Sequence, residues 1–272
     1  MKKAYSLLEL SIVLVIMGFI AFTFTAVIDS FLKVNRFKTS FQRLDLVESS
    51  LLRFLNENRG LPCPAGHDLS SNDTGFGEDG DSCDASSVTE VCADAEAYEV
   101  AGVVVGYKGS IPAITLDLPT EYMYDGFDRR FTYFVSSDLI CKNGVDINSG
   151  FYSNEDNLPI VYNKPNTSTS VYEYQKNAYV IVSHGKNGFG AYTKSGEKIS
   201  TDSASSDEIE NSDSDNEFVY NYFRPESMDD ILRFKNKWQL MNDLEELDST
   251  KRYPSEECNC STGIDKFNDM CL

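Results

Sequence analysis

The feature that most constrains this 272-residue chain is an apolar run, Leu10 to Ile28, that directly follows a glutamate. As a helix the run would be about 28 Å long, close to the hydrocarbon thickness of a bilayer. Burying the carboxylate of Glu9 in lipid without a partner would cost several kcal/mol. The run therefore predicts a membrane-spanning helix, and Glu9 requires a reason of its own.

A helical pattern continues beyond the apolar run. Apolar residues recur three and four positions apart from Phe31 to Leu55, with charged residues between them. No proline occurs before Pro62 to interrupt the helix. We therefore predict one continuous helix of about 50 residues, in which residues 5–28 span the membrane and residues 29–58 are amphipathic and pack on a domain. A separate coiled-coil stalk is the alternative for the second part.

The net charge of the chain limits the classes of molecule that it can bind. There are 43 acidic and 24 basic residues, which give a formal net charge of −19. Such a charge repels the phosphates of nucleic acids, so nucleic-acid binding is disfavoured as a function.

The cysteines point to an oxidising compartment. All seven lie beyond Arg59, on one side of the apolar run, and this number is unusual for a cytosolic chain. We expect at least two disulfides, one that joins Cys83 to Cys92 and one within the C-terminal tail. The odd count leaves at least one thiol unpaired or in an intermolecular bond. The candidates are Cys63, Cys83, Cys92, Cys141, Cys258, Cys260 and Cys271.

Residues 59–272 are predicted to form an α+β domain. Residues 66–99 are rich in Asp, Gly and Ser, which is typical of a long exposed loop. Four later runs rich in β-branched and aromatic residues predict an antiparallel sheet, which the long helix covers in a two-layer arrangement. The run MDDILRFKNKWQLMNDLEEL near the end predicts a short helix. The predicted strands lie within residues 100–107, 129–137, 177–185 and 217–223.

The N-terminal sequence KKAYSLLELSIVLVIMGFI resembles the signal of type IV pilins and pseudopilins. In that family a prepilin peptidase cuts before the apolar segment and methylates the new amino terminus. The resemblance implies a leader of residues 1–4, cleavage between Ala4 and Tyr5, and methylation at Tyr5. It also implies that Glu9 neutralises the amino terminus of the neighbouring subunit in a filament. The family usually has glycine before the cut, where this chain has Ala4.

Later motifs extend the resemblance to the globular domain of a bacterial branch of pilin-like proteins. They are LPCPAG, GSIPAITLDLP, YMYDGFDRRFTYFV and YVIVSHGKNGFGAY, with Phe127 at the position where relatives commonly carry tryptophan. The acidic tract of residues 201–216 resembles a variable loop that holds calcium in major pseudopilins. Its density of charge alone favours a solvated loop, so calcium is the alternative there. The implied calcium ligands are Asp207, Glu208, Glu210, Asp213 and Asp215.

Nothing in the sequence predicts an enzyme. The chain has two histidines, His67 and His184, and neither accompanies a G-x-S-x-G motif. The run GKNGFG lacks the order of a phosphate-binding loop and suits a hairpin turn.

The resemblance implies a minor pilin or pseudopilin, a structural subunit of a type II secretion pseudopilus or a type IV pilus. The implied partners are prepilin peptidase, other pilin or pseudopilin subunits, an inner-membrane assembly platform and the lipid bilayer. The implied location is the bacterial inner membrane, with the amino terminus cytoplasmic and the domain periplasmic. No cofactor is expected apart from calcium. The alternative is a membrane-anchored periplasmic binding module that does not polymerise.

Overall fold

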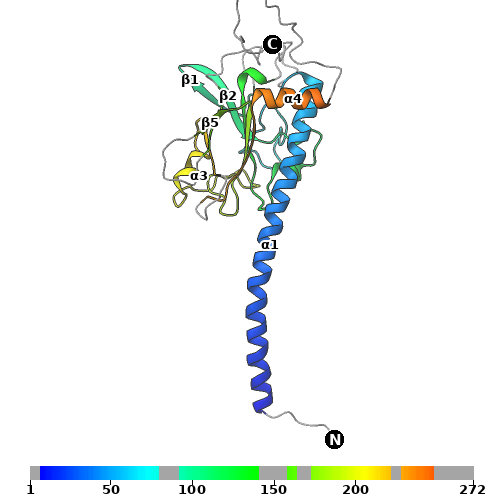
Figure 1. The fold of residues 1–272 in the computed structure, drawn as a ribbon, viewed down its shortest axis with the longest axis vertical. Helices are drawn as coiled ribbons and strands as arrows, with labels where there is room; N and C mark the ends of the chain where they lie inside the picture. The colour runs from blue at the N-terminus through cyan, green and yellow to red at the C-terminus, as the bar shows by residue number, and fades with distance from the viewer. Residues whose placement is uncertain (1–6, 80–91, 141–157, 164–172, 222–227, 248–272) are drawn as a thin grey trace, which may run out of the picture.

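The computed structural model describes residues 7–79, 92–140, 158–163, 173–221 and 228–247. Its dominant element is helix α1 (Leu7–Asn58), which is 52 residues long and would measure about 78 Å at 1.5 Å per residue. Figure 1 shows that the C-terminal part of α1 lies along a folded domain, whereas its N-terminal part extends well beyond that domain. The predicted continuous helix is therefore present, and it ends at Asn58 as predicted.

The prediction that residues 5–28 span a membrane is wrong. A helix needs about 20 consecutive apolar residues to cross the hydrocarbon core of a bilayer. Within the part of the chain that the structure describes, no helix is both long enough and apolar enough to do so. The predicted fold class is corrected accordingly: the protein is α+β with an antiparallel sheet, and the membrane-spanning helix is removed from the description.

The domain contains two sheets. The larger sheet has the order β1-β2-β3-β6-β8, and its neighbouring strands are all antiparallel. The smaller sheet has the order β5-β4-β7, in which β4 pairs with β5 antiparallel and with β7 parallel. The strands are β1 (Glu96–Val100), β2 (Val103–Ser110), β3 (Thr132–Ser136), β4 (Ile160–Asn163), β5 (Glu173–Lys176), β6 (Tyr179–Ser183), β7 (Glu217–Tyr220) and β8 (Ile231–Lys235).

One face of the larger sheet packs against α1. The helix buries side chains spaced three and four residues apart, as the predicted amphipathic stripe requires. They meet inward-facing residues of the sheet such as Tyr133, Val135 and Ile181 in one hydrophobic core. The residues that α1 buries there are Leu44, Val47, Leu51 and Leu55.

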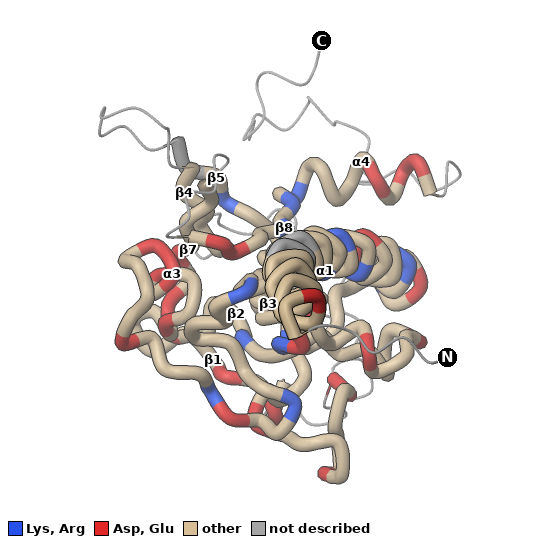
Figure 2. Tube along the Cα trace, turned by 90° about the horizontal axis from the view of Figure 1, so that it is seen from below, with Lys and Arg blue, Asp and Glu red and all other residues tan. Residues whose placement is uncertain are grey.

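The smaller sheet covers the opposite face of the larger one. Phe134 and Val180, which alternate with the α1-facing residues, pack against Val161 of β4 and Phe218 of β7. The rings of Phe134 and Phe218 meet edge to face with centroids 5.8 Å apart. The domain therefore has three layers in place of the predicted two, and Figure 2, viewed along α1, shows the smaller sheet and α1 on opposite sides of the larger sheet.

The C-terminal part of the domain also differs from the prediction. The run predicted as one helix forms strand β8 and, after Asn236, helix α4 (Lys237–Leu247). Strand β8 pairs with β6 over its whole length, from Ile231 opposite Ser183 to Lys235 opposite Tyr179. The edge of β6 thus determines the conformation of this segment. Three short helices complete the description: η1 (Thr120–Met123), η2 (Ser137–Leu139) and α3 (Ser206–Glu210).

The loop of residues 125–130 holds α1 at the point where the helix leaves the domain. The backbone N–H of Gly126 donates to the Ser40 hydroxyl (2.9 Å), and Arg43 donates to the Tyr124 carbonyl (3.0 Å). The rings of Phe37 and Phe127 meet edge to face at 4.9 Å between centroids. C-terminal to this level one face of α1 is buried in the domain, and N-terminal to it the described side chains from Leu7 to Arg36 are exposed.

Candidate functional site

The first candidate site is the exposed part of α1. Leu7 is 88% exposed, Phe22 77% and Phe31 70%. Six consecutive residues, Ile12 to Met17, are all exposed apolar residues, and in an α-helix they turn through more than a full circle. This stretch of the helix is therefore apolar on every side. Its exposed large apolar residues are Leu7, Leu8, Leu10, Ile12, Val13, Leu14, Val15, Ile16, Met17, Phe19, Ile20, Phe22, Ile28, Phe31, Leu32 and Val34.

Glu9 lies in the first described turn of α1, among these apolar residues, and its side chain is exposed. It is the only acidic residue of that turn. A carboxylate in this place becomes costly as soon as another apolar surface covers the helix, because covering removes its water. A partner that packs here and supplies a positive group would reduce this cost.

The acidic tract of residues 201–216 is ordered. Helix α3 begins with a capping box, in which the Ser205 hydroxyl accepts from the Glu208 N–H and the Glu208 carboxylate accepts from the Ser205 N–H (2.9 Å). Glu208 and Asn211 are buried. The favoured expectation of a solvated loop therefore fails for these residues, because their polar side chains find hydrogen-bond partners inside the domain.

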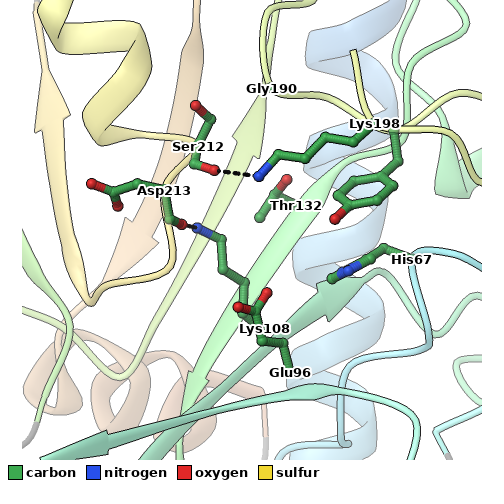
Figure 3. A pocket seen from close by; sticks show the side chains of 9 residues that line it. His67, Glu96, Lys108, Thr132, Gly190, Lys198, Ser212 and Asp213 are labelled. Carbon is green, nitrogen blue, oxygen red and sulfur yellow. Dashed lines mark hydrogen bonds between the residues drawn. The ribbon is translucent and has the colours of Figure 1, made fainter. Parts of the chain in front are cut away.

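Two lysines that line a small polar cavity bind backbone carbonyls of this tract (Figure 3). Lys108 of β2 donates to the Asp213 carbonyl, and Lys198 donates to the Ser212 carbonyl (2.9 Å). Burial lowers the pKa of Lys108 to about 8. The Asp213 carboxylate points away from both amines in Figure 3.

The cavity itself offers little room for a ligand. Its volume is about 10 Å³, which is enough for one water molecule. His67 lines it, stacked on Tyr192 with ring centroids 4.0 Å apart, and burial lowers the pKa of His67. With both lysines already bound to backbone carbonyls, the arrangement anchors the acidic tract to the sheet.

His184 is a second histidine in a structural role. It is fully buried, and its Nε2 atom lies 2.8 Å from the Thr132 hydroxyl. Burial, with smaller effects of Lys108 and Lys198, lowers the pKa of His184 to about 3, so the ring is neutral at physiological pH.

The second candidate site is a cluster of three carboxylates. Glu208 of α3 meets Asp229 and Asp230, which directly precede β8, and one oxygen from each lies within 4.8 Å of the other two. Glu208 and Asp230 are buried, and Asp229 is half-buried. Among the described residues this is the one group of at least three His, Cys, Asp or Glu residues placed to hold a metal ion.

Only Glu208 of the five implied calcium ligands belongs to this cluster. Asp207 lies on the more exposed side of α3, and Asp213 and Asp215 lie in the turn that leads to β7. In Figure 2 the acidic positions of this region gather on α3 and beside β7. Asp229 and Asp230 are not predicted as ligands, because MDDIL is typical of a helix start. The signal that could single them out is a pair of adjacent carboxylates before an apolar strand.

Among the described residues, Cys63 and Cys92 form a disulfide. The predicted pairing of Cys83 with Cys92 is therefore wrong. The core explains the choice, because Cys63 and Cys92 are both buried beside α1 and the larger sheet. The remaining candidates, Cys83, Cys141, Cys258, Cys260 and Cys271, lie outside the described residues, as do Ala4 and Tyr5 of the predicted cleavage site.

Comparisons of the chain with protein-family models, with curated proteins and with solved structures found no match.

Proposed function

We propose that this protein is a pilin-like structural subunit, a minor pilin or pseudopilin, that assembles through the exposed part of α1. One observation carries the proposal: the helix projects from its domain, and its described side chains between Leu7 and Val34 are mostly exposed apolar ones, which cover every side of the helix from Ile12 to Met17. Exposed apolar surface of this extent is rare on isolated soluble proteins and marks a surface that is covered by partners.

The shape of this surface favours other subunits as the partners. A helix with one apolar stripe needs one neighbour, whereas a helix that is apolar all round needs neighbours on several sides. The helices of like subunits, stacked around a common axis, provide such an environment at the usual spacing of 8–10 Å between axes. Each large side chain that becomes buried contributes about 1.5–3 kcal/mol, so a few turns suffice for stable packing.

Glu9 supports the same assignment. In a bundle of apolar helices its carboxylate requires a positive partner, and the N-terminal resemblance supplies one in the amino group of Tyr5 of the next subunit. The low dielectric between packed apolar helices strengthens such a pair, while the cost of desolvation penalises every register that leaves the carboxylate unpaired. Glu9 would thus set the register of stacking after prepilin peptidase has released the leader.

The disulfide is consistent with the compartment in which such subunits work. Disulfides persist in oxidising environments such as the bacterial periplasm. The bond between Cys63 and Cys92 lies in the core of the domain. We therefore propose that the domain lies in the periplasm, as part of a pseudopilus or pilus whose assembly platform engages the subunit.

Photo-crosslinking in cells tests this proposal. A photoreactive amino acid at Ile16, on the exposed part of α1, should yield adducts that contain other pilin-like subunits. The same amino acid at Trp238, which is 40% exposed on α4, is the matched control and should not yield them. Adding Glu9→Gln, which keeps the size of the side chain and removes its charge, should sharply reduce the Ile16 adducts while the protein level stays near normal.

The alternative, a periplasmic binding module that does not polymerise, predicts the opposite result. A photoreactive amino acid at Ile16 would then yield no adducts with other subunits, and Glu9→Gln would not change the cross-linking. Such a result, in cells where the system is expressed and Tyr5 is found as the mature amino terminus, would overturn the assembly role.

A further inference from the structure

The cluster formed by Glu208, Asp229 and Asp230 contains more negative charge than its surroundings neutralise. None of the ion pairs between described residues involves these three carboxylates. Glu208 is 1% exposed and Asp230 is 4% exposed, so water screens their mutual repulsion poorly. Buried charges are normally paired with an opposite charge or coordinated to a metal.

Hydrogen bonds satisfy some of the carboxylate oxygens. Glu208 accepts from the Asn187 side chain through Oε1 (2.6 Å) and from the Ser205 N–H through Oε2. Asp229 Oδ2 accepts from the Lys186 N–H (2.8 Å), and Asp230 Oδ2 accepts from the Asn211 side chain (2.9 Å). These neutral donors orient the three carboxylates but do not cancel their charge.

Two carboxylate oxygens of the cluster accept no hydrogen bond. Asp229 Oδ1 and Asp230 Oδ1 are both buried and have no hydrogen-bond partner. A buried polar atom without a partner is destabilising, and each one in a native protein calls for an explanation. The two atoms belong to adjacent residues of one cluster.

The backbone of the turn after β6 closely approaches one of them. Gly185 has a φ of +59°, and a Cβ atom built on it would lie 2.3 Å from Asp229 Oδ1. Any residue with a side chain would therefore collide with this oxygen and would also be strained at that φ. The turn after β6 thus approaches the carboxylate closely, with backbone alone.

Two ligands could relieve such a cluster, a proton or a cation. Burial, together with the neighbouring Glu208 and Asp229, raises the pKa of Asp230 well above its ordinary value, and burial also raises the pKa of Asp229. A proton neutralises one of the three negative charges, whereas a divalent cation neutralises two.

We infer that Glu208, Asp229 and Asp230 bind one hard divalent cation, with calcium as the ion that fits. Calcium takes carboxylate oxygens at 2.3–2.6 Å, so ligands that share one ion lie at most about 5 Å apart. The separations of up to 4.8 Å in the cluster meet this condition. Magnesium fits less well, because its octahedral shell is smaller and it usually retains several waters.

This site does not depend on the proposed assembly role, and it differs from the ligand set that the resemblance implies. It draws on three segments: the start of α3, the turn after β6 through Gly185 and Asn187, and the residues before β8. A cation there would join the acidic tract to the edge strand of the larger sheet. Its removal should loosen that connection and leave the α1-facing core intact.

Calorimetric titration of the full-length protein in detergent, after treatment with a chelator, tests the inference. We expect one calcium ion per chain, with a Kd between about 10⁻⁶ and 10⁻³ M. Calcium at about 100 times the Kd should raise the Tm by roughly 5–10 °C. Magnesium at the same concentration should raise it less.

Asp230→Asn provides the decisive variant, and Asp207→Asn its matched control. Both remove one negative charge, and Asp207 lies next to Glu208 but outside the cluster. Asp230→Asn should weaken calcium binding at least tenfold and abolish the rise in Tm. Without calcium its Tm should equal or exceed that of wild type, because an amide relieves the repulsion. Asp207→Asn should bind calcium within about twofold of wild type, since screening by solvent reduces its influence.

If Asp230→Asn does not fold, Asp229→Asn, at a half-buried position, replaces it with the same expectations. The inference is overturned if wild type binds no calcium at millimolar concentration, which would identify protonated carboxylic acids as the resting state. It is equally overturned if Asp207→Asn loses calcium binding as fully as Asp230→Asn does, because the acidic surface of the domain, and not the cluster, would then bind the ion.

Discussion

Gly126 touches the carbonyl group of Arg36 so closely that a Cβ atom at Gly126 would lie 1.9 Å from the Arg36 oxygen. The contact joins the loop of residues 125–130 to α1 at the level where the helix leaves the domain. The same loop is held from within by Asp125, which accepts from the Phe127 N–H (2.8 Å) and from the Ser183 hydroxyl (2.7 Å). The direction in which α1 projects is therefore fixed by a backbone-to-backbone contact that only glycine permits.

Gly126→Ala should reduce the free energy of unfolding by about 2–3 kcal/mol, because the new methyl group meets backbone that cannot rotate away. Denaturant unfolding of the two proteins measures the difference. Gly18→Ala, on the exposed part of α1, is the control, since a Cβ there meets nothing within 4 Å. It should be neutral or stabilising by up to about 1 kcal/mol. Equal effects of the two substitutions would contradict the proposed contact.

Arg130 is a buried cation that holds two loops together. Its guanidinium donates to the carbonyls of Gly66, Leu69, Thr193 and Lys194, and the side chain is almost fully buried. Arg130→Lys keeps the charge but cannot reach four carbonyls at once, so we expect a loss of about 3 kcal/mol or more.

Arg53→Lys is the matched control for Arg130→Lys. Arg53 makes one hydrogen bond, to the Leu116 carbonyl (2.8 Å), and its side chain is 49% exposed. This substitution should change stability by less than about 1 kcal/mol. Thermal or denaturant unfolding of the two variants measures the difference. A small loss of stability in Arg130→Lys would show that water replaces the hydrogen bonds of the Arg130 guanidinium.

His184 should make the domain sensitive to acid. Its pKa is about 3 in the folded protein and about 6.5 when unfolded, so the unfolded chain takes up a proton first as the pH falls. Stability from this residue is fully present above pH 6.5 and is lost progressively towards pH 3. Between pH 7 and pH 5 wild type should lose about 2 kcal/mol relative to His184→Gln.

The comparison with His184→Gln isolates this residue from groups that act in the opposite direction. Burial raises the pKa of Asp125 and of Asp230, and both are present in the two proteins. The measurement is the free energy of unfolding of each protein at several pH values. Parallel pH profiles would mean that His184 titrates normally and that water reaches it.

The disulfide should contribute measurably to stability. Cys63→Ser opens a loop in which the two cysteines are 29 residues apart, which should cost about 3–4 kcal/mol in chain entropy. Cys92→Ser and the double variant should lose the same amount, because each removes the same bond. Unequal losses would point to a separate packing role for one of the cysteines.

The parts of this fold that follow from the sequence are those set by local patterns. The buried face of α1 is predicted by the spacing of Leu44, Val47, Leu51 and Leu55, because helical geometry alone places them on one side. The core of β3 is likewise predicted by its β-branched and aromatic residues. Neither prediction needs knowledge of distant residues.

The parts that do not follow depend on contacts between distant segments. Residues 231–235 form a strand because the edge of β6 is available, although the run MDDIL is typical of a helix start. That register places Asp230 beside Glu208, which precedes it by 22 positions. The partner of Cys92 depends in the same way on the packing of α1, which brings Cys63 to it.

The position of the Cys63–Cys92 bond has a mechanical consequence. Cys63 follows the end of α1 by five residues, and Cys92 precedes β1 by four. Under a pulling force on the projecting end of α1, the intervening segment could otherwise extend by about 100 Å before β1 carried the tension. The covalent bond prevents this extension. Force on α1 would then pass through Cys63 and Cys92 to β1. With the disulfide intact the domain would resist extension under such a force; with the disulfide reduced it would extend.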